Sequence, residues 1–287
     1  MTSLPKIQNV FHKIRTIECI PLIAGAALFL LFESSCMIEK QFIFFPDKEV
    51  VETPADAGLA FEDLFLLTPD GVRINAWFIP FSGSQKVLLW LHGNGGNLGH
   101  RVDQLRFLHR ELKINILMID FRGYGRSEGV VTEKGTYQDA VTSYDYLVSR
   151  VEIDPQGVIV YGQSLGAAVA VDLAVQRRAA GVILEAPFVS IREMAKVVFP
   201  WLPIGRLLST RYDLHSKIGR IETPLLLLHG DQDEVVPYAQ GRKVFEAAKS
   251  PKQFYTVQGA GHNDLYRIGG GGYTETISRF IEGASRR

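Results

Sequence analysis

The sequence predicts an α/β fold in which a mostly parallel, eight-stranded sheet is covered by helices on both faces. From about residue 60 onward, short apolar runs alternate with longer amphipathic runs, and this strand–helix–strand repetition is typical of a parallel sheet. Several of the short runs, such as KVLLWL and NILMI, are apolar throughout, as expected for strands buried on both faces. The turn Pro69-Asp70-Gly71 joins the first two runs, which we expect to form an antiparallel hairpin at the sheet edge.

The expected elements follow in order along the chain. Strands are predicted at Phe61–Leu67, Val72–Ile79, Lys86–Leu91, Asn115–Ile119, Gly157–Tyr161, Val182–Leu184, Leu225–Leu228 and Gln253–Val257. Helical periodicity is found at about residues 98–112, 133–149, 165–177, 238–249 and 273–283. Residues 187–223 have no strand pattern but contain the apolar stretch FPWLPIG, so this connection is either a small cap over the site or a surface crossing. We therefore expect one globular domain, residues 41–287, after an N-terminal segment of residues 1–40.

Composition excludes some classes of protein. The 287 residues are 46% hydrophobic, which is enough for one large core. The 31 Lys and Arg residues balance 31 Asp and Glu residues, so there is no electrostatic reason to expect a nucleic-acid partner. The two cysteines, Cys19 and Cys36, both precede the globular part, so neither a disulfide framework nor a cysteine-based metal site is expected there.

The N-terminal segment combines basic and apolar residues. Lys6, Lys13 and Arg15 precede the uncharged run Ile20–Phe32. As a helix this run rises about 20 Å, less than the roughly 30 Å of a bilayer's hydrocarbon core. Three interpretations remain open: an uncleaved anchor, a cleaved or Cys36-lipidated signal, and a helix packed on the domain. We favour a single membrane anchor, and the basic residues then predict an extracytoplasmic domain.

Two stretches match the pattern Gly-x-Ser-x-Gly, GQSLG at residues 162–166 and GRSEG at residues 125–129. A nucleophilic serine in such a motif lies on a sharp turn, with a strand directly before it and a helix directly after it. GVIVY runs straight into GQSLG, and LGAAVAVDLAVQ continues as a helix whose N-terminus favours an oxyanion. GRSEG begins after the strand NILMI has ended, and no helical pattern follows it. We therefore expect Ser164, and not Ser127, to be the nucleophile.

A serine nucleophile needs a histidine base. His262 follows the last predicted strand in QGAGHND, at the same carboxyl edge of the sheet as Ser164, and is the predicted base. His92 and His229 each end a strand in the dipeptide HG, where the ring usually braces the loop.

The acid that orients this base is expected in LLLLHGDQDEVVP, after the seventh strand. Asp233 would lie at the apex of this loop and is preferred, with Asp231 and Glu234 as its neighbours. Glu185, at the end of the sixth strand, remains an outside alternative.

Two backbone N–H groups are needed to stabilise the negative charge that forms on the substrate. We expect one from Leu165, the residue after the nucleophile, and the other from Asn94 in HGNGGN, with Gly95 as the alternative.

These motifs together resemble the α/β-hydrolase superfamily. Within it, the chain is similar to a membrane-anchored group, the α/β-hydrolase-domain proteins 12, 13 and 17 and their bacterial relatives. The matching stretches span about residues 42–264 and are FIFFP, HGNGGN, DFRGYGRSEG, GQSLG, LEAPF, HGDQDEVVP and GAGHND. The family pattern places nucleophile, acid and base on Ser164, Asp233 and His262, in the chain order typical of the superfamily. It also implies that GRSEG is a structural loop beside the site.

The resemblance implies a serine hydrolase that forms an acyl-enzyme on ester or thioester substrates and needs no metal or organic cofactor. Relatives act on lipid esters, lysophospholipids or palmitoyl thioesters, so the implied substrate is a small acyl or lipid-like molecule. Some relatives are serine peptidases, which leaves an amidase as the alternative. A non-catalytic membrane-tethered interaction domain is a second alternative. A dinucleotide-binding loop at HGNGGNLG is the third, but it lacks the G-x-G-x-x-G spacing and leaves GQSLG unexplained. The sequence does not define the oligomeric state.

Overall fold

A computed structural model describes residue 39 and residues 41–202, 205, 208–249 and 251–284. The chain divides into two compact units, residues 1–43 and 44–287. In the first unit, residues 39 and 41–43 are helical, and the predicted apolar segment Ile20–Phe32 lies outside the described residues. None of the helices in the described ranges is long and apolar enough to cross a membrane.

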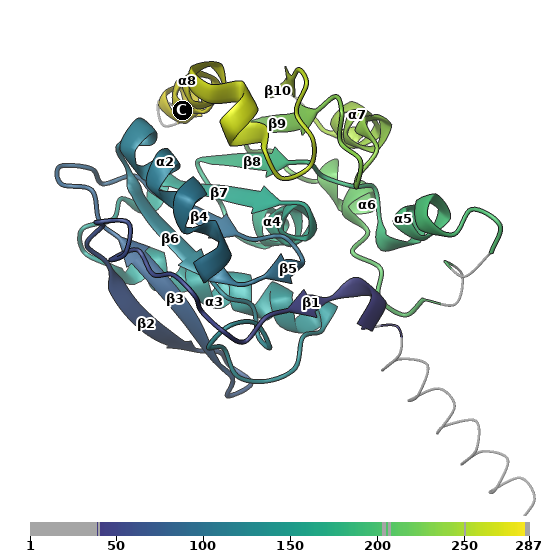
Figure 1. Cartoon of the computed structure of the whole chain (residues 1–287). Coiled ribbons are helices and arrows are strands. Elements are labelled where there is room, and N and C mark those ends of the chain that lie inside the picture. Colours follow the sequence, from purple (N-terminus) through teal and green to yellow (C-terminus); the bar gives the residue numbers. More distant parts are fainter. Residues whose placement is uncertain (1–38, 40, 203–204, 206–207, 250, 285–287) are drawn as a thin grey trace, which may run out of the picture. The chain divides into compact units, whose positions relative to one another are not determined.

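The second unit is built on an eight-stranded sheet with the order β10-β9-β8-β7-β4-β6-β3-β2 (Figure 1). The strands are β2 Glu62–Leu67, β3 Arg73–Ile79, β4 Val87–Leu91, β6 Asn115–Ile119, β7 Val158–Gln163, β8 Gly181–Glu185, β9 Leu225–Gly230 and β10 Lys252–Val257. Strand β3 pairs antiparallel with both β2 and β6, and the remaining pairs are parallel. The predicted mostly parallel sheet with an antiparallel edge hairpin is therefore confirmed.

Helices cover both faces of this sheet. They are η1 Leu98–Arg101, α2 Val102–Leu112, α3 Glu133–Ser149, α4 Leu165–Gln176, α5 Ile191–Val198, α6 Leu214–Ile218, α7 Tyr238–Ala247 and α8 Leu265–Ala284, with a short 3-10 turn, η2, at Pro155–Gly157. Helices α2 and α8 pack on each other over one face, while α3 and α4 pack together with β7 and β4 on the other side.

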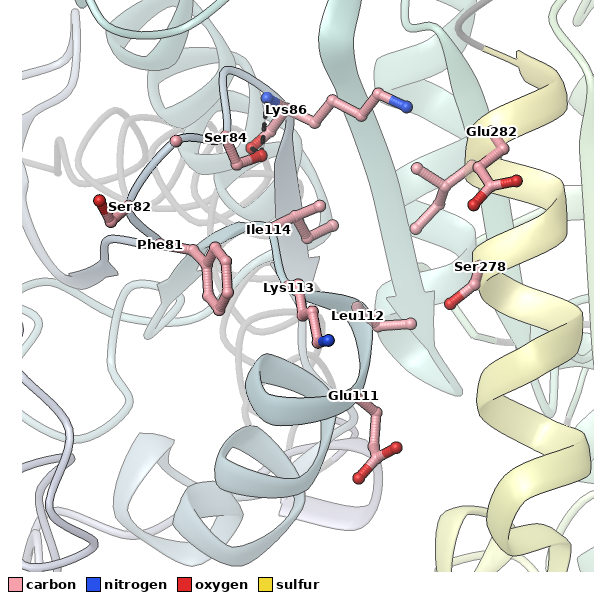
Figure 2. A pocket seen from close by; sticks show the side chains of 12 residues that line it. Phe81, Ser82, Ser84, Lys86, Glu111, Leu112, Lys113, Ile114, Ser278 and Glu282 are labelled. Atoms are coloured by element: carbon pink, nitrogen blue, oxygen red, sulfur yellow. Dashed lines mark hydrogen bonds between the residues drawn. The ribbon is translucent and has the colours of Figure 1, made fainter.

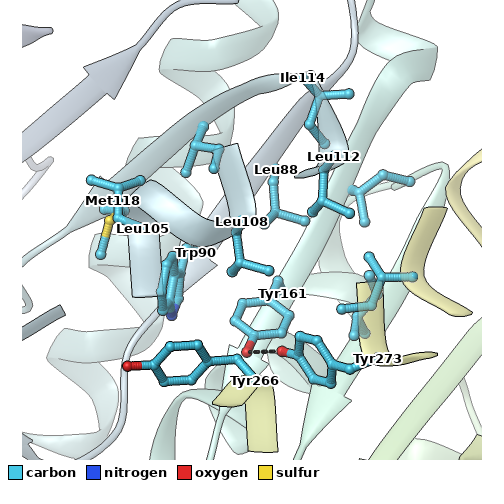
Figure 3. Packing of buried hydrophobic residues seen from close by; sticks show 14 of the residues in the cluster. Leu88, Trp90, Leu105, Leu108, Leu112, Ile114, Met118, Tyr161, Tyr266 and Tyr273 are labelled. Atoms are coloured by element: carbon cyan, nitrogen blue, oxygen red, sulfur yellow. Dashed lines mark hydrogen bonds between the residues drawn. The ribbon is translucent and has the colours of Figure 1, made fainter. Parts of the chain in front are cut away.

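The core on the α2 and α8 side is shown in Figure 3. Alternate strand residues such as Leu88, Trp90 and Tyr161 point to this face, where they meet Leu105 of α2 and Tyr273 of α8. This alternation follows from the two-residue repeat of a strand, which sends successive side chains to opposite faces. Each fully buried large apolar side chain stabilises the fold by about 1.5–3 kcal/mol.

Helix α8 is longer than the sequence pattern predicts. It begins at Leu265 rather than near residue 273, and Gly270, with φ 46° and ψ −128°, interrupts it. Glycine adopts this backbone conformation at little cost, so the run GGGG becomes a kink within helical structure and does not precede the helix.

The connection at residues 187–223 contains helices α5 and α6, and its described residues form no strand. Ser190 caps α5, because its side chain accepts a hydrogen bond from the backbone N–H of Glu193 (3.2 Å). No residue of α5 is buried.

A second, two-stranded sheet was not predicted. Strand β1 (Phe45–Pro46) pairs in parallel with β5 (Gly95–Gly96), within the loop that follows β4. The Asn97 amide reinforces this pairing by donating to the carbonyl of Glu49 (2.6 Å). The start of the second unit is therefore tied to the loop that carries Asn94.

Candidate active site

Ser164 lies on a one-residue turn between β7 and α4. Strand β7 ends at Gln163 and α4 begins at Leu165. The backbone of Ser164 has φ 51° and ψ −113°, which is outside the regions that L-residues usually occupy and costs about 1–3 kcal/mol. A hydrogen bond from the Ser164 N–H to the carbonyl of Glu185 (2.8 Å) holds the turn.

The two glycines of GQSLG are required by close packing. A Cβ at Gly162 would collide with the carbonyl of Gly166 and with Ala167. A Cβ at Gly166 would collide with the carbonyls of Leu91 and His92, at the end of the neighbouring strand β4. Because backbone atoms cannot move aside cheaply, only glycine fits at either position.

The structure brings Ser164, His262 and Asp233 together at the carboxyl edge of the sheet. His262 follows β10, and its Nε2 lies 3.0 Å from the Ser164 Oγ. Its Nδ1 lies 2.8 Å from the Oδ2 of Asp233, which follows β9. With a proton on Nδ1, the ring donates to the carboxylate and Nε2 accepts from the serine hydroxyl, as a general base must.

The Asp233 side chain is fully buried. Burial opposes its ionisation, but hydrogen bonds from His229 and His262 outweigh this effect and hold its pKa below the usual value. Its Oδ1 also accepts from the backbone N–H groups of Val235 (2.9 Å) and Val236 (2.7 Å). Asp233 is therefore a carboxylate at neutral pH and can stabilise a positively charged His262.

The neighbouring acids predicted as alternatives bind elsewhere. Asp231 accepts a hydrogen bond from the N–H of Gly259 (2.6 Å). Glu234 accepts one from the backbone N–H of His262 (3.3 Å), and not from its ring.

Glu185 belongs to a buried network beneath the nucleophile. Its carboxyl group accepts from the hydroxyls of Tyr161 (2.7 Å) and Tyr273 (2.5 Å) and from the amide of Gln163 (2.9 Å). Burial raises its pKa, and these hydrogen bonds oppose the shift. Glu185 thus supports the residue before Ser164 and makes no hydrogen bond to the His262 ring.

Ser127 is a structural serine in the described geometry. Its hydroxyl donates to the carbonyl of Asp120 (2.7 Å) and accepts from the N–H of Asn75 (2.8 Å). The side chain is buried and already has both partners, which matches the sequence-based distinction between the two motifs.

Both strand-ending histidines brace their loops. Nδ1 of His92 lies 2.5 Å from the carbonyl of Gly93, and Nε2 of His229 lies 3.0 Å from the carbonyl of Val236. His229 also reaches Oδ2 of Asp233 (3.2 Å), a contact that the sequence did not predict. The only sequence signal for this contact is the i, i+4 spacing of His229, near the end of β9, and Asp233, in the loop that follows.

Residues 93–97, which we call the oxyanion loop, lie directly beside the nucleophile. A Cβ at Gly93 would be 3.5 Å from the Cβ of Ser164. Asn94 is the next residue after Gly93, and Leu165 opens α4 directly after Ser164. An oxyanion site requires two such N–H groups close to the nucleophile.

A hollow of about 450 Å³ lies at the opposite edge of the sheet (Figure 2). Its walls come from segments that precede β4 and β6, including Phe81, Lys86 and Lys113, and from Glu282 of α8. Ligands of parallel sheets bind beyond the carboxyl ends of the strands, where Ser164 lies. This hollow is therefore distinct from the candidate active site.

A family model and several known proteins match this chain. A family model described as "Serine aminopeptidase, S33" matches residues 83–212 and 204–266. The α/β hydrolase domain-containing protein WAV2 of Arabidopsis thaliana is 32% identical over 286 residues, with 91% of each chain covered. The chain belongs to the α/β-hydrolase superfamily.

This hydrolase is also 35% identical to human α/β hydrolase domain-containing protein 17B over 223 residues, covering 77% of this chain and 75% of the human one. The esterase Pf2001 of Pyrococcus furiosus has a similar fold, with a TM-score of 0.70 and 22% identity, over 85% of the hydrolase and 98% of the esterase. The resemblance to the superfamily that the motifs predict is confirmed.

Proposed function

We propose that this protein is a serine hydrolase that cleaves acyl esters or thioesters through an acyl-enzyme intermediate. The observation that carries the proposal is the continuous chain of contacts from the Ser164 hydroxyl to His262 (3.0 Å) and from His262 to Asp233 (2.8 Å). A nucleophile, a base and an orienting carboxylate in this arrangement are the requirements for acyl transfer.

In the first half of the reaction, Ser164 Oγ attacks the acyl carbonyl while His262 Nε2 takes its proton. The carbonyl oxygen becomes an oxyanion, which accepts hydrogen bonds from the N–H groups of Asn94 and Leu165. His262 then returns the proton to the departing alcohol or thiol, and the acyl group stays on Ser164. In the second half, His262 removes a proton from water, which attacks the acyl-enzyme. His262 then returns this proton to Ser164 Oγ as the bond between Oγ and the acyl carbon breaks and the acid is released.

We further propose a lipid-like substrate at a membrane surface. The support is an apolar segment in the connection at residues 187–223, where Val198, Trp201 and Leu202 are exposed. Exposed apolar and tryptophan side chains favour the interface between water and lipid. The predicted anchor Ile20–Phe32 would hold the enzyme at that surface with its hydrolase domain outside the cytoplasm.

The proposal is tested by labelling with a fluorophosphonate probe and by turnover of p-nitrophenyl esters of increasing chain length. Ser164→Ala should abolish labelling and lower turnover by about 10⁶-fold. Ser127→Ala should retain labelling, since that hydroxyl is occupied by Asp120 and Asn75. Labelling that persists in Ser164→Ala would contradict the proposal. Faster turnover of aminoacyl anilides than of any ester would indicate a peptidase instead.

A further inference from the structure

Every backbone carbonyl of the oxyanion loop accepts a hydrogen bond from the protein. The carbonyl of Gly93 is bound by the ring of His92 (2.5 Å), and that of Asn94 by the N–H of Phe45 (3.1 Å) and the hydroxyl of Tyr124 (2.9 Å). The N–H of Asp47 donates to the carbonyl of Gly96 (3.2 Å). The guanidinium of Arg101 donates to the carbonyls of Gly95 and Asn97 (2.7 Å each). Since N–H and C=O point in opposite directions across a planar trans peptide, fixing the Gly93 carbonyl also fixes the Asn94 N–H.

Arg101 is the one side chain in this set that binds two of these carbonyls. It ends η1, just after the loop, and its two terminal nitrogens donate to the carbonyls of Gly95 and Asn97. The spacing matches the planar fork of a guanidinium, which a lysine ammonium lacks. The side chain therefore bridges the middle of the loop at Gly95 and its last residue, Asn97.

The surroundings strengthen these hydrogen bonds. Arg101 is partly exposed, but its Nε is fully covered and has no partner among the described residues. Burial lowers the pKa of Arg101 to about 10, and the charge of Asp120 opposes that shift. The guanidinium is thus still positive at neutral pH, and hydrogen bonds from a charged donor are about twice as strong as neutral ones.

We propose that Arg101 is a positioning residue for catalysis, which shapes the oxyanion loop so that the Asn94 N–H points at the acyl oxygen. This inference rests on the proposed function, because it assigns a role in that same reaction. Arg101 itself does not contact the reacting atoms. It acts through the carbonyls of Gly95 and Asn97, and its loss should weaken binding of the transition state more than binding of the substrate.

The first test compares Arg101→Met and Arg101→Lys with Arg106→Met. Arg106 lies in α2 nearby, is exposed and pairs with Asp103, so it is a matched control. With a p-nitrophenyl ester, Arg101→Met should lower kcat by about 10- to 100-fold, with KM within about two-fold of the original, because oxyanion stabilisation acts on the transition state. Arg101→Lys should fall in between, and Arg106→Met should match the unmodified enzyme.

An alkyl trifluoromethyl ketone supplies the readout that a purely structural role would not change. Its adduct on Ser164 carries an oxyanion, so its affinity should fall by the same factor as kcat/KM in each Arg101 variant. A loss of kcat/KM with unchanged ketone affinity would overturn the positioning role.

Amide hydrogen exchange tests the same inference without turnover. Peptides covering residues 93–99 should exchange faster in Arg101→Met, while those of α4 should be unaffected; unchanged exchange in the loop would overturn the inference. If the unmodified enzyme neither hydrolyses esters nor binds the ketone, the proposed function fails. Faster exchange of the loop amides in the variant would still support the conclusion that Arg101 stabilises the loop. If Arg101→Met fails to fold, ketone affinity and hydrogen exchange can still be measured on Arg101→Lys.

Discussion

At the scale of single residues, Asp120 is a buried acid with an incomplete set of partners. It directly follows β6, and its Oδ1 accepts from the N–H of Leu98 (3.0 Å), just after the oxyanion loop. Its Oδ2 is buried without a hydrogen bond among the described residues. Burial raises the pKa of Asp120 to about 7, although the positive charge of Arg101 opposes this shift. The folded protein thus holds a proton that an unfolded chain releases near pH 4.

Asp120 should therefore make the stability of the protein fall as pH rises. The raised pKa means that its favourable contribution is complete below about pH 4 and is lost as pH passes about 7. Between pH 5 and pH 8 we expect the free energy of unfolding to drop by about 3 kcal/mol relative to Asp120→Asn, which cannot ionise. Urea unfolding of both proteins at the two pH values measures this difference. Parallel pH profiles would rule the effect out.

The three residues that the sequence identifies directly are those in short, local motifs. Ser164 could be found because strand, turn and helix follow one another within GVIVYGQSLG, and His262 and Asp233 because each follows a strand. The function of Arg101 was not predicted, because its partners are backbone carbonyls. Every residue has such a carbonyl, so the residue types do not indicate which ones Arg101 binds. The contact between His229 and Asp233 depends in the same way on loop geometry.

At the scale of secondary structure, the strands were predicted within about one or two residues, because apolar β-branched runs are a strong signal. Helices α5 and α6 were not predicted, since the connection around FPWLPIG is interrupted by prolines and α6 has only five residues. Strand β1 was not predicted because Phe45–Pro46 is two residues long and its partner lies fifty positions away. Such short elements form because of their tertiary contacts.

The exposed apolar side chains at the end of α5 and just after it should affect turnover only of substrates that are held in lipid aggregates. Trp201 is 81% exposed, and burying Trp201 and Val198 in an interface is worth about 1.5–3 kcal/mol each. We expect Trp201→Ser combined with Val198→Ser to lower turnover of long-chain esters in micelles by about 10-fold or more, with p-nitrophenyl acetate unaffected. Val151→Ser, at a site 99% exposed elsewhere on the surface, is the control. Equal losses on both substrates would argue against interfacial contact.

At the scale of the whole molecule, the second unit contains every residue assigned to the proposed reaction. Ser164, Asp233, His262 and the oxyanion loop all follow strands of one sheet and meet at one edge of it. Open parallel sheets place their ligand sites at this edge, so the topology itself brings distant residues together.

Removing residues 1–38 should separate attachment from catalysis. The shortened chain should hydrolyse p-nitrophenyl acetate at the rate of the full chain, because the site lies wholly in residues 44–287. The full chain should sediment with membranes and the shortened chain should not, since the apolar run Ile20–Phe32 is then absent. Recovery of the full chain in the supernatant would contradict the predicted anchor.

The separation of Ser164 from its base along the chain has a consequence for synthesis. His262 is translated 98 residues after Ser164, which takes about 5–20 s at ordinary ribosome speeds. During that interval the growing chain contains Ser164 without its base, so the serine hydroxyl is not activated for hydrolysis. Activity therefore begins only after translation has passed β10, so a truncated product cannot attack nearby acyl groups in the cell.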